Sequence, residues 1–174
     1  MKNNLDLLKK YWQNDEFRPM QKEIIEHYQS GKDTVVVLPT GGGKSICYQL
    51  PAIIQEGLTL VISPLISLMQ DQVNQLNERG IKAMFFDNNT LKNPLDHQFD
   101  NAKYGNFKLV YSSPERLLNE SFLNQIKSLK IHGIAIDEAH CVSEWGHDFR
   151  PAFKAIKNLK QLLPDVPMIA LTAT

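Results

Sequence analysis

The chain has 174 residues, of which 43% are hydrophobic, and this is enough for one globular domain but excludes a disordered or fibrous protein. Lys plus Arg and Asp plus Glu both number 19, so no net charge attracts the whole protein to nucleic acid, and any such contact must be local. The sequence has neither an apolar run of membrane-spanning length nor a signal-peptide pattern, which predicts a cytoplasmic protein, nucleoid-associated in a bacterium, with no membrane partner.

The order of apolar runs and amphipathic segments predicts an α/β fold. Two helices, over 4–12 and 19–30, precede the first strand. Runs rich in Val, Ile and Phe then predict buried strands at 34–38, 58–63, 81–86, 107–112, 134–136 and 168–172. Helical patterns lie between them, as with Leu68, Met69, Gln72 and Val73 after the second strand, and 87–94 is a predicted loop. The alternation predicts a parallel sheet of about six or seven strands with helices on both faces.

Polar motifs follow five of the six predicted strands. They are PTGGGKS at 39–45, SP at 63–64, SSPER at 112–116, DEAH at 137–140 and TAT at 172–174. In open α/β sheets, ligands bind at the carboxyl ends of the strands. The motifs are therefore expected to converge on one crevice.

The stretch LPTGGGKS at 38–45 is close to the phosphate-binding pattern G-x-x-x-x-G-K-[ST], with leucine in place of the first glycine. The predicted ATP-binding loop consists of Pro39, Thr40, Gly41, Gly42, Gly43, Lys44 and Ser45. Its glycines let backbone N–H groups approach phosphate oxygens, and a helix expected to open at Lys44 adds its positive dipole end. Lys44 would bind the β- and γ-phosphates, and Ser45 would bind Mg²⁺. A glycine-rich turn without a ligand is the alternative.

The DEAH segment brings two adjacent carboxylates to the end of an apolar strand, which is unfavourable unless a cation or solvent receives them. Asp137 is predicted to hold Mg²⁺ and Glu138 to activate the water that attacks the γ-phosphate, with His140 beside them in the catalytic set. A solvated acidic turn is the alternative. A zinc site made of Asp137, His140, Cys141 and His147 is disfavoured because neither C-x-x-C nor H-E-x-x-H spacing is present. The two cysteines, Cys47 and Cys141, are expected to be reduced.

The segment CVSEWGHDFRP at 141–151 is rich in aromatic and basic side chains. The residues of interest are Trp145, His147, Phe149 and Arg150. Such a mixture can stack on exposed bases and bind phosphate, so it is a candidate for DNA binding and for coupling that binding to the carboxylates. The composition is equally compatible with core residues of a short helix.

Two Ser-Pro segments follow predicted strands. Ser63-Pro64 and Ser112-Ser113-Pro114 would present hydroxyls and helix N-terminal amides to a nucleic-acid backbone. They are also ordinary helix caps.

Taken in order, these segments resemble the RecQ family of superfamily-two DNA helicases over essentially the whole chain. FRPMQ at 17–21 is similar to the adenine-recognition motif, LPTGGGKS to motif I, VISPLISLMQDQV to motif Ia, IDEAH to motif II and LTAT to motif III. The most specific likeness is DEAH continuing into CVSEWGHDFRP, which resembles the family's aromatic-rich loop. This likeness favours the DNA-coupling interpretation of that loop.

The resemblance implies a P-loop NTPase RecA-like lobe over 31–174, preceded at 1–30 by helices that carry the adenine-recognition motif. It implies that Gln21 reads the adenine edge beside Arg18, and that Thr172 and Thr174 belong to the motif coupling ATP to DNA. The chain departs from the family pattern at Trp12-Gln13, where Phe-Gly is usual, and at Met20, where glycine is frequent.

The implied activity is ATP- and Mg²⁺-dependent 3′-to-5′ movement on single-stranded or partly duplex DNA, with unwinding, in DNA repair or recombination. The family's motor has a second RecA-like lobe, and the sequence ends at Thr174 with motif III. We therefore expect a first motor lobe that binds ATP weakly and does not unwind DNA. The alternatives are an RNA-directed helicase of the same superfamily, a nucleotide-dependent regulatory module without turnover, and a structural interaction domain.

Overall fold

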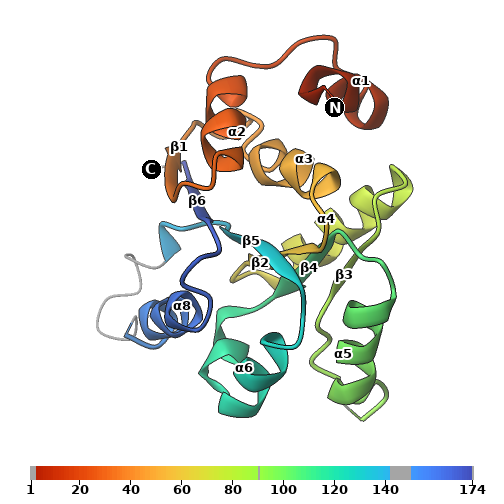
Figure 1. Cartoon of the computed structure of the whole chain (residues 1–174), viewed down its shortest axis with the longest axis vertical. Coiled ribbons are helices and arrows are strands. Elements are labelled where there is room, and N and C mark those ends of the chain that lie inside the picture. The colour runs from red at the N-terminus through yellow and green to blue at the C-terminus, as the bar shows by residue number, and fades with distance from the viewer. Residues whose placement is uncertain (1–2, 90, 142–149, 174) are drawn as a thin grey trace.

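The protein folds around a six-stranded sheet in which all paired strands are parallel (Figure 1). The computed structural model describes residues 3–89, 91–141 and 150–173, without the side chains of residues 150, 152 and 153. The strands are β1 (Thr34–Val37), β2 (Leu58–Ile62), β3 (Ala83–Phe85), β4 (Leu109–Ser112), β5 (Ile131–Ile136) and β6 (Met168–Thr172). Their order across the sheet is β1-β6-β5-β2-β4-β3, so the strands that precede the predicted ATP motifs lie side by side.

Helices cover both faces of the sheet. They are α1 (Asn4–Trp12), α2 (Gln21–Gln29), α3 (Ile46–Ile54), α4 (Ile66–Glu78), α5 (Leu95–Tyr104), α6 (Glu120–Ile126) and α8 (Arg150–Leu162), with a 3₁₀ helix η1 (Pro114–Leu118). Figure 1 shows α2 and α3 on one side of the strands and α6 and α8 on the other. This arrangement confirms the α/β fold predicted from the sequence.

The alternation of side chains along the strands divides the core into two layers. On β2, Val61 packs in the layer formed by α1 to α4, whereas Leu60 and Ile62 pack in the layer formed by α5, α6 and α8. In the second layer Phe86, Phe99 and Phe122 form a triangle with ring centroids 4.8 to 5.2 Å apart. Such aromatic packing stabilises the layer beyond its buried area. The N-terminal helices share the first layer with the sheet, so they form part of the platform under the phosphate loop.

The observed boundaries differ from the expected ones mainly at strand ends and at one helix start. The run at 81–86 contains a strand of only three residues at the sheet edge. Helix α3 begins at Ile46 rather than at Lys44, because Lys44 lies in a turn in which its carbonyl accepts the N–H of Cys47 at 3.0 Å. The chain therefore enters α3 through a tight turn at Lys44, closed by a hydrogen bond over three residues.

The strand β1 forms one edge of the sheet and leads directly into the phosphate loop. Its side chains Val35 and Val37 are 78% and 62% exposed, whereas Val36 between them is buried. The edge therefore carries two exposed apolar side chains. Within the described residues, no helix combines the length and hydropathy required to cross a lipid bilayer.

Candidate ATP site and nucleic-acid edge

The carboxyl ends of the central strands are joined by backbone hydrogen bonds. Leu38 N–H donates to the Thr172 carbonyl at 3.1 Å, and Ala139 N–H donates to the Leu171 carbonyl at 2.9 Å. Asp137 N–H donates to the Ile62 carbonyl at 2.9 Å. The segments predicted as motifs I, II and III, far apart in the sequence, therefore meet at one edge as expected.

The phosphate loop requires its glycines. Gly41 and Gly43 have φ angles of 80° and 75°, in the left-handed region that favours glycine. A Cβ on Gly42 would lie 2.8 Å from the Pro39 carbonyl oxygen, which itself accepts the Gly42 N–H at 2.9 Å. The leucine at position 38 lies at the end of β1, where no left-handed angle occurs, so it leaves the loop conformation intact.

Two side chains of the loop are placed for phosphate and metal chemistry. The ammonium of Lys44 turns back into the loop and donates to the Leu38 and Pro39 carbonyls at 3.2 and 3.3 Å. Ionised phosphate oxygens are stronger acceptors than these carbonyls. Ser45 stands at the N-cap of α3, yet its hydroxyl makes no capping bond, so that oxygen can serve as a ligand for Mg²⁺.

The segment predicted to recognise adenine forms hydrogen bonds with the predicted phosphate loop directly. Gln21 is 1% exposed, and its amide nitrogen donates to the Gly43 carbonyl at 3.0 Å while its amide oxygen accepts the Arg18 N–H at 2.8 Å. The guanidinium of Arg18 donates to the Gly41 carbonyl. The positions of Arg18 and Gln21, both predicted to lie at the base, thus depend on the conformation of the loop. Their contact with adenine stays a prediction.

The two departures from the RecQ pattern in this segment occupy left-handed backbone. Gln13, the C-cap of α1, has φ 58°, and Met20, the N-cap of α2, has φ 70°. A side chain at such an angle costs about 1–2 kcal/mol relative to glycine. The chain therefore keeps the backbone that glycine favours without having glycine at either position.

A polar cavity of about 290 Å³ adjoins this segment. It is lined by Trp12, Asn14, Arg18, Ser45, Ile46, Gln49, Gln72, Gln75, Leu76 and Arg79. An aromatic ring, two guanidinium groups and several amides provide the stacking and hydrogen-bonding groups that a purine base requires. Ser45, the residue of the loop predicted to bind Mg²⁺, also lines the cavity.

Asp137 is held by two hydrogen bonds. The side chain is 6% exposed, and one carboxylate oxygen accepts the Glu138 N–H at 2.9 Å. The other oxygen accepts the amide nitrogen of Gln72, on α4, at 3.1 Å. These bonds fix the rotamer of the carboxylate predicted to hold Mg²⁺.

Glu138, His140 and Thr172 form a linked series. Glu138 has φ 52°, an unusual angle for a non-glycine residue, of the kind that often occurs at functional sites. Its carboxylate lies 3.4 Å from His140 Nε2, and His140 Nδ1 lies 3.1 Å from the Thr172 hydroxyl. The predicted catalytic base is therefore connected through His140 to the segment predicted as motif III.

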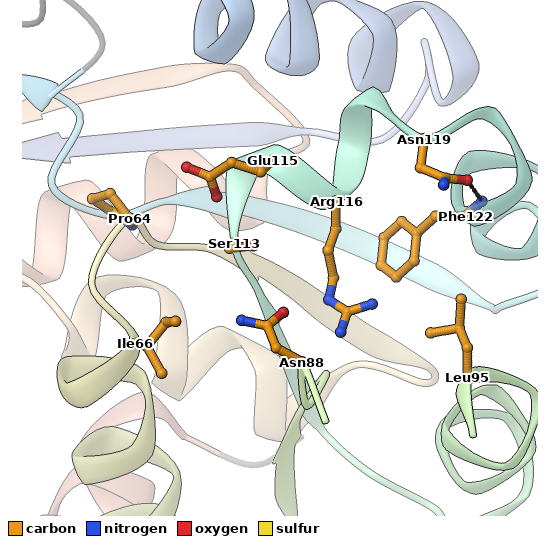
Figure 2. A pocket seen from close by; sticks show the side chains of 9 residues that line it. All are labelled: Pro64, Ile66, Asn88, Leu95, Ser113, Glu115, Arg116, Asn119 and Phe122. Carbon is orange, nitrogen blue, oxygen red and sulfur yellow. Dashed lines mark hydrogen bonds between the residues drawn. The ribbon is translucent and has the colours of Figure 1, made fainter. Parts of the chain in front are cut away.

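The Ser-Pro segments border a second hollow of about 600 Å³ at the same edge of the sheet (Figure 2). Pro64 and Ser113 line it from the ends of β2 and β4, and Arg116 projects from η1 toward Asn88. The Arg116 guanidinium lies 5.8 Å from the ring centroid of Phe122. The Arg116 cation and the neutral polar groups can bind a nucleic-acid backbone, whereas the Glu115 carboxylate, which also lines the hollow, repels phosphate.

Ser63 and Ser113 are both buried, and neither caps a helix through its side chain. Ser63 is 1% exposed, and Leu65 rather than Ser63 is the N-cap of α4. Ser113 is the N-cap of η1, yet its hydroxyl makes no capping bond. The helix-cap alternative thus holds for Ser113 by its position, without a side-chain bond, and does not hold for Ser63. Pro64 and the groups around Arg116 form more of the accessible surface than Ser63 does.

Part of the predicted DNA-coupling set lies outside the described residues. This holds for Trp145, His147, Phe149 and Thr174, and for the side chain of Arg150. Their roles stay predictions, and so does the alternative in which the aromatic residues belong to a core helix.

Sequence reasoning did not identify the side chains that support Asp137. Gln72 appeared only as a member of the helical stripe at Leu68, Met69 and Val73, although a polar residue within an apolar stripe was the available signal. Tyr48 and Tyr111, which continue from Gln72 into the core, carried no such signal because aromatic residues are common in cores.

Comparison with known proteins agrees with this geometry. The profile of the DEAD/DEAH box helicase family matches residues 18–174. ATP-dependent DNA helicase RecQ of Haemophilus influenzae is 48% identical over 170 residues, covering 98% of this chain and 28% of that protein. RecQ of Bacillus subtilis is 46% identical, covering 97% of this chain and 29% of that protein. The chain thus spans less than a third of the length of these relatives.

Solved structures show the same fold at low sequence identity. The helicase MrfA, crystallised with DNA, superposes with a TM-score of 0.77 at 23% identity, over 100% of this chain and 26% of that one. A hypothetical ATP-dependent RNA helicase from Sulfolobus tokodaii superposes with a TM-score of 0.69 at 21% identity, over 100% of this chain and 51% of that one. These matches support a helicase-type motor fold.

Proposed function

The chain belongs to the DEAD/DEAH box helicase family, and from this premise we propose that it is the ATP-binding first motor lobe of a RecQ-like DNA helicase. In the proposed whole protein, ATP hydrolysis drives 3′-to-5′ movement along single-stranded DNA and opens duplexes during DNA repair or recombination. A second RecA-like lobe of the same parent chain completes the motor. We place its action in the cytoplasm, at the nucleoid in a bacterium.

One observation carries the ATP part of the proposal. The glycine loop with Lys44 and the carboxylates Asp137 and Glu138 lie at the same sheet edge, on strands separated only by β6. This is the pairing of phosphate-binding and metal-binding groups that phosphoryl transfer requires.

The residues present fit Mg-ATP. The Ser45 hydroxyl makes no capping bond, and Asp137 is a buried, hydrogen-bonded carboxylate. Lys44 and the N–H groups of Gly41 to Gly43 would bind the phosphates, and the cavity lined by Trp12 and Arg18 would receive the base. Bound Mg²⁺ neutralises charge on the phosphates. Glu138, supported by His140, would take the proton of the attacking water.

Two observations support DNA as the proposed track. The relatives of highest identity described above are named as DNA helicases, and the hollow around Pro64 and Arg116 lies at the same edge as the ATP site. The formal net charge of zero means that binding depends on such local groups. The RNA-directed alternative differs in substrate while keeping the same ATP chemistry.

The test is binding of a fluorescent ATP analogue to the chain, with and without Mg²⁺. We expect weak, Mg²⁺-dependent binding that Lys44→Ala abolishes, because the substitution removes the charge that binds the β- and γ-phosphates. Binding that is unchanged in Lys44→Ala, or no binding by the unmodified chain, would contradict the proposal.

The substrate is tested by comparing ATPase stimulation by single-stranded DNA and by RNA of the same sequence in the parent protein. Stimulation by DNA alone is expected, whereas stimulation by RNA alone would support the RNA-directed alternative. For the 174-residue chain we expect little DNA-stimulated turnover and no unwinding, since an arginine finger from a second lobe contributes a factor of about 10³–10⁵. Strand separation by this chain would contradict that expectation.

A further inference from the structure

A buried series of hydrogen bonds connects the phosphate-loop helix to Asp137 through α4. Tyr48, on α3, is fully buried and donates its hydroxyl hydrogen to the amide oxygen of Gln72 at 2.8 Å. The amide nitrogen of the same Gln72 donates to the Asp137 carboxylate at 3.1 Å. The two ends of one amide group thus connect α3, the helix after the phosphate loop, with Asp137 of the DEAH segment.

The series continues behind Tyr48 in one direction. Because the Tyr48 hydrogen is already used for Gln72, the contact of 3.4 Å between the two hydroxyls has Tyr111 as donor. Tyr111 in turn accepts the amide nitrogen of Gln49 at 3.2 Å. All members therefore donate toward Asp137, in a region of low dielectric where aligned hydrogen bonds strengthen one another.

The chemistry at both ends fixes the orientation of the Gln72 amide. The reversed orientation would place the amide oxygen against the Asp137 carboxylate, two acceptors without a hydrogen between them. It would also leave the Tyr48 hydroxyl facing a donor. The observed orientation is the one that satisfies both neighbours.

We propose that Gln72 is a positioning residue for the Mg²⁺-binding carboxylate Asp137, and that Tyr48 holds its amide in the required orientation. The inference rests on the proposed function, because it assigns a support for the metal site of that function. The amide bond, together with the backbone bond from Glu138, fixes the rotamer of the Asp137 carboxylate before a metal binds. Loss of such a supporting hydrogen bond typically lowers metal affinity or activity about 10- to 100-fold.

The location of Gln72 gives this support a second consequence. Gln72 lies on α4, the helix that follows Ser63-Pro64 at the nucleic-acid edge, and it also lines the cavity beside Arg18. A displacement of α4 would change the contact to Asp137 directly. Asp137, the carboxylate proposed to bind Mg²⁺, is thus hydrogen-bonded to α4, the helix that follows the proposed DNA contact at Ser63-Pro64.

The test compares the affinity for a fluorescent ATP analogue with and without Mg²⁺ in three variants of the chain. Gln72→Leu removes the amide, Tyr48→Phe removes only the hydroxyl that orients it, and Gln70→Leu is the matched control on the exposed side of α4. We expect Gln72→Leu to lower the ratio of the affinities with and without Mg²⁺ about tenfold. Because Gln72 also lines the cavity proposed for the base, the metal-free affinity of each variant serves as its own reference. Tyr48→Phe should lower the ratio by a smaller factor, and Gln70→Leu should behave as the unmodified chain.

The outcomes separate the two proposals. An equal Mg²⁺-dependent gain in Gln72→Leu and Gln70→Leu overturns the positioning role while leaving the proposed function intact. A Gln72→Leu variant whose affinity falls by the same factor with and without Mg²⁺ also overturns it, since that result indicates a lost contact with the base or a general structural role. An unmodified chain without any Mg²⁺-dependent binding overturns the proposed function, and the positioning role with it.

Discussion

The amide nitrogen of Gln21 donates a 3.0 Å hydrogen bond to the carbonyl oxygen of Gly43, inside the phosphate loop. A Cβ on Gly43 would overlap that same nitrogen. The residue predicted to read the base and the glycine expected to cradle the phosphates therefore depend on each other sterically. A displacement of Gly43 therefore displaces Gln21, and the reverse, even when no nucleotide is bound.

Gly43→Ala should consequently impair both stability and nucleotide binding. Its φ of 75° makes any side chain strained by about 1–2 kcal/mol, and the overlap displaces Gln21 in addition. The matched control is Gly80→Ala, where φ is 83° and a Cβ meets no atom within 4 Å. Urea unfolding should show a larger loss for Gly43→Ala, and only that variant should lose binding of the ATP analogue. Equal losses in both variants would refute the steric link.

Glu138→Gln should separate binding from turnover in the parent protein. The amide keeps the size of the side chain and its contact with His140, but it cannot accept a proton from water. We expect unchanged binding of the ATP analogue and a fall in ATP turnover of at least about 100-fold. A variant that hydrolyses ATP at the normal rate would show that Glu138 is not the base.

Met20→Gly should stabilise the chain. Met20 is 56% exposed with φ 70°, so glycine relieves backbone strain while removing little buried surface. The expected increase in the free energy of unfolding is about 1 kcal/mol, measured by chemical denaturation. Met20→Ala retains a Cβ and serves as the control, for which no comparable gain is expected. A similar gain in both variants would trace the effect to the methionine side chain rather than to φ.

His132 should make the protein less stable as the pH falls below neutrality. Burial lowers the pKa of His132 to about 4, from an ordinary value of 6.5. Between these values the unfolded chain takes up a proton that the folded chain does not, so the free energy of unfolding decreases as the pH falls from 6.5 toward 4. For this partly exposed ring the loss should be on the order of 2 kcal/mol.

The measurement is urea unfolding at several pH values for the unmodified chain and for His132→Gln. Other titrating groups contribute equally to both proteins, so the difference between the two curves reports His132 alone. The variant should lose less stability between pH 6.5 and 4. Parallel curves would show that the His132 pKa is ordinary in the folded state.

The strands were predictable from their runs of apolar residues, although burial on both faces holds for strands such as β2 and β4 and not for β1, where Val35 and Val37 are exposed. The run before the phosphate loop and the run before DEAH both fall on observed strands, β1 and β5. Helix α5 was not predicted, since its sequence LDHQFDNAKY buries only Gln98, Phe99 and Ala102, too few for a clear apolar stripe. Local patterns therefore gave the sheet more reliably than its outer helices.

For the site, sequence order identified the groups that follow strands, but not the groups that support them. Lys44 and Asp137 belong to local motifs, whereas Gln72 reaches Asp137 across 65 positions of sequence. That contact depends on how α4 crosses the sheet, which no local spacing encodes. The left-handed angle at Met20 does not follow from methionine itself, and its one sign was the glycine that is frequent at this place in the RecQ family.

The exposed edge at β1 also affects the tendency of the 174-residue chain to self-associate in solution. Val35 and Val37 stand beside a row of backbone groups at the sheet edge, a combination that favours pairing with another chain. Apparent nucleotide affinity should therefore be measured across a range of protein concentrations, with sedimentation alongside. Strand β1 continues directly into Pro39 and the glycines. A second chain that pairs with this edge would therefore restrict the loop. Self-association of the chain and ATP binding would then be thermodynamically linked.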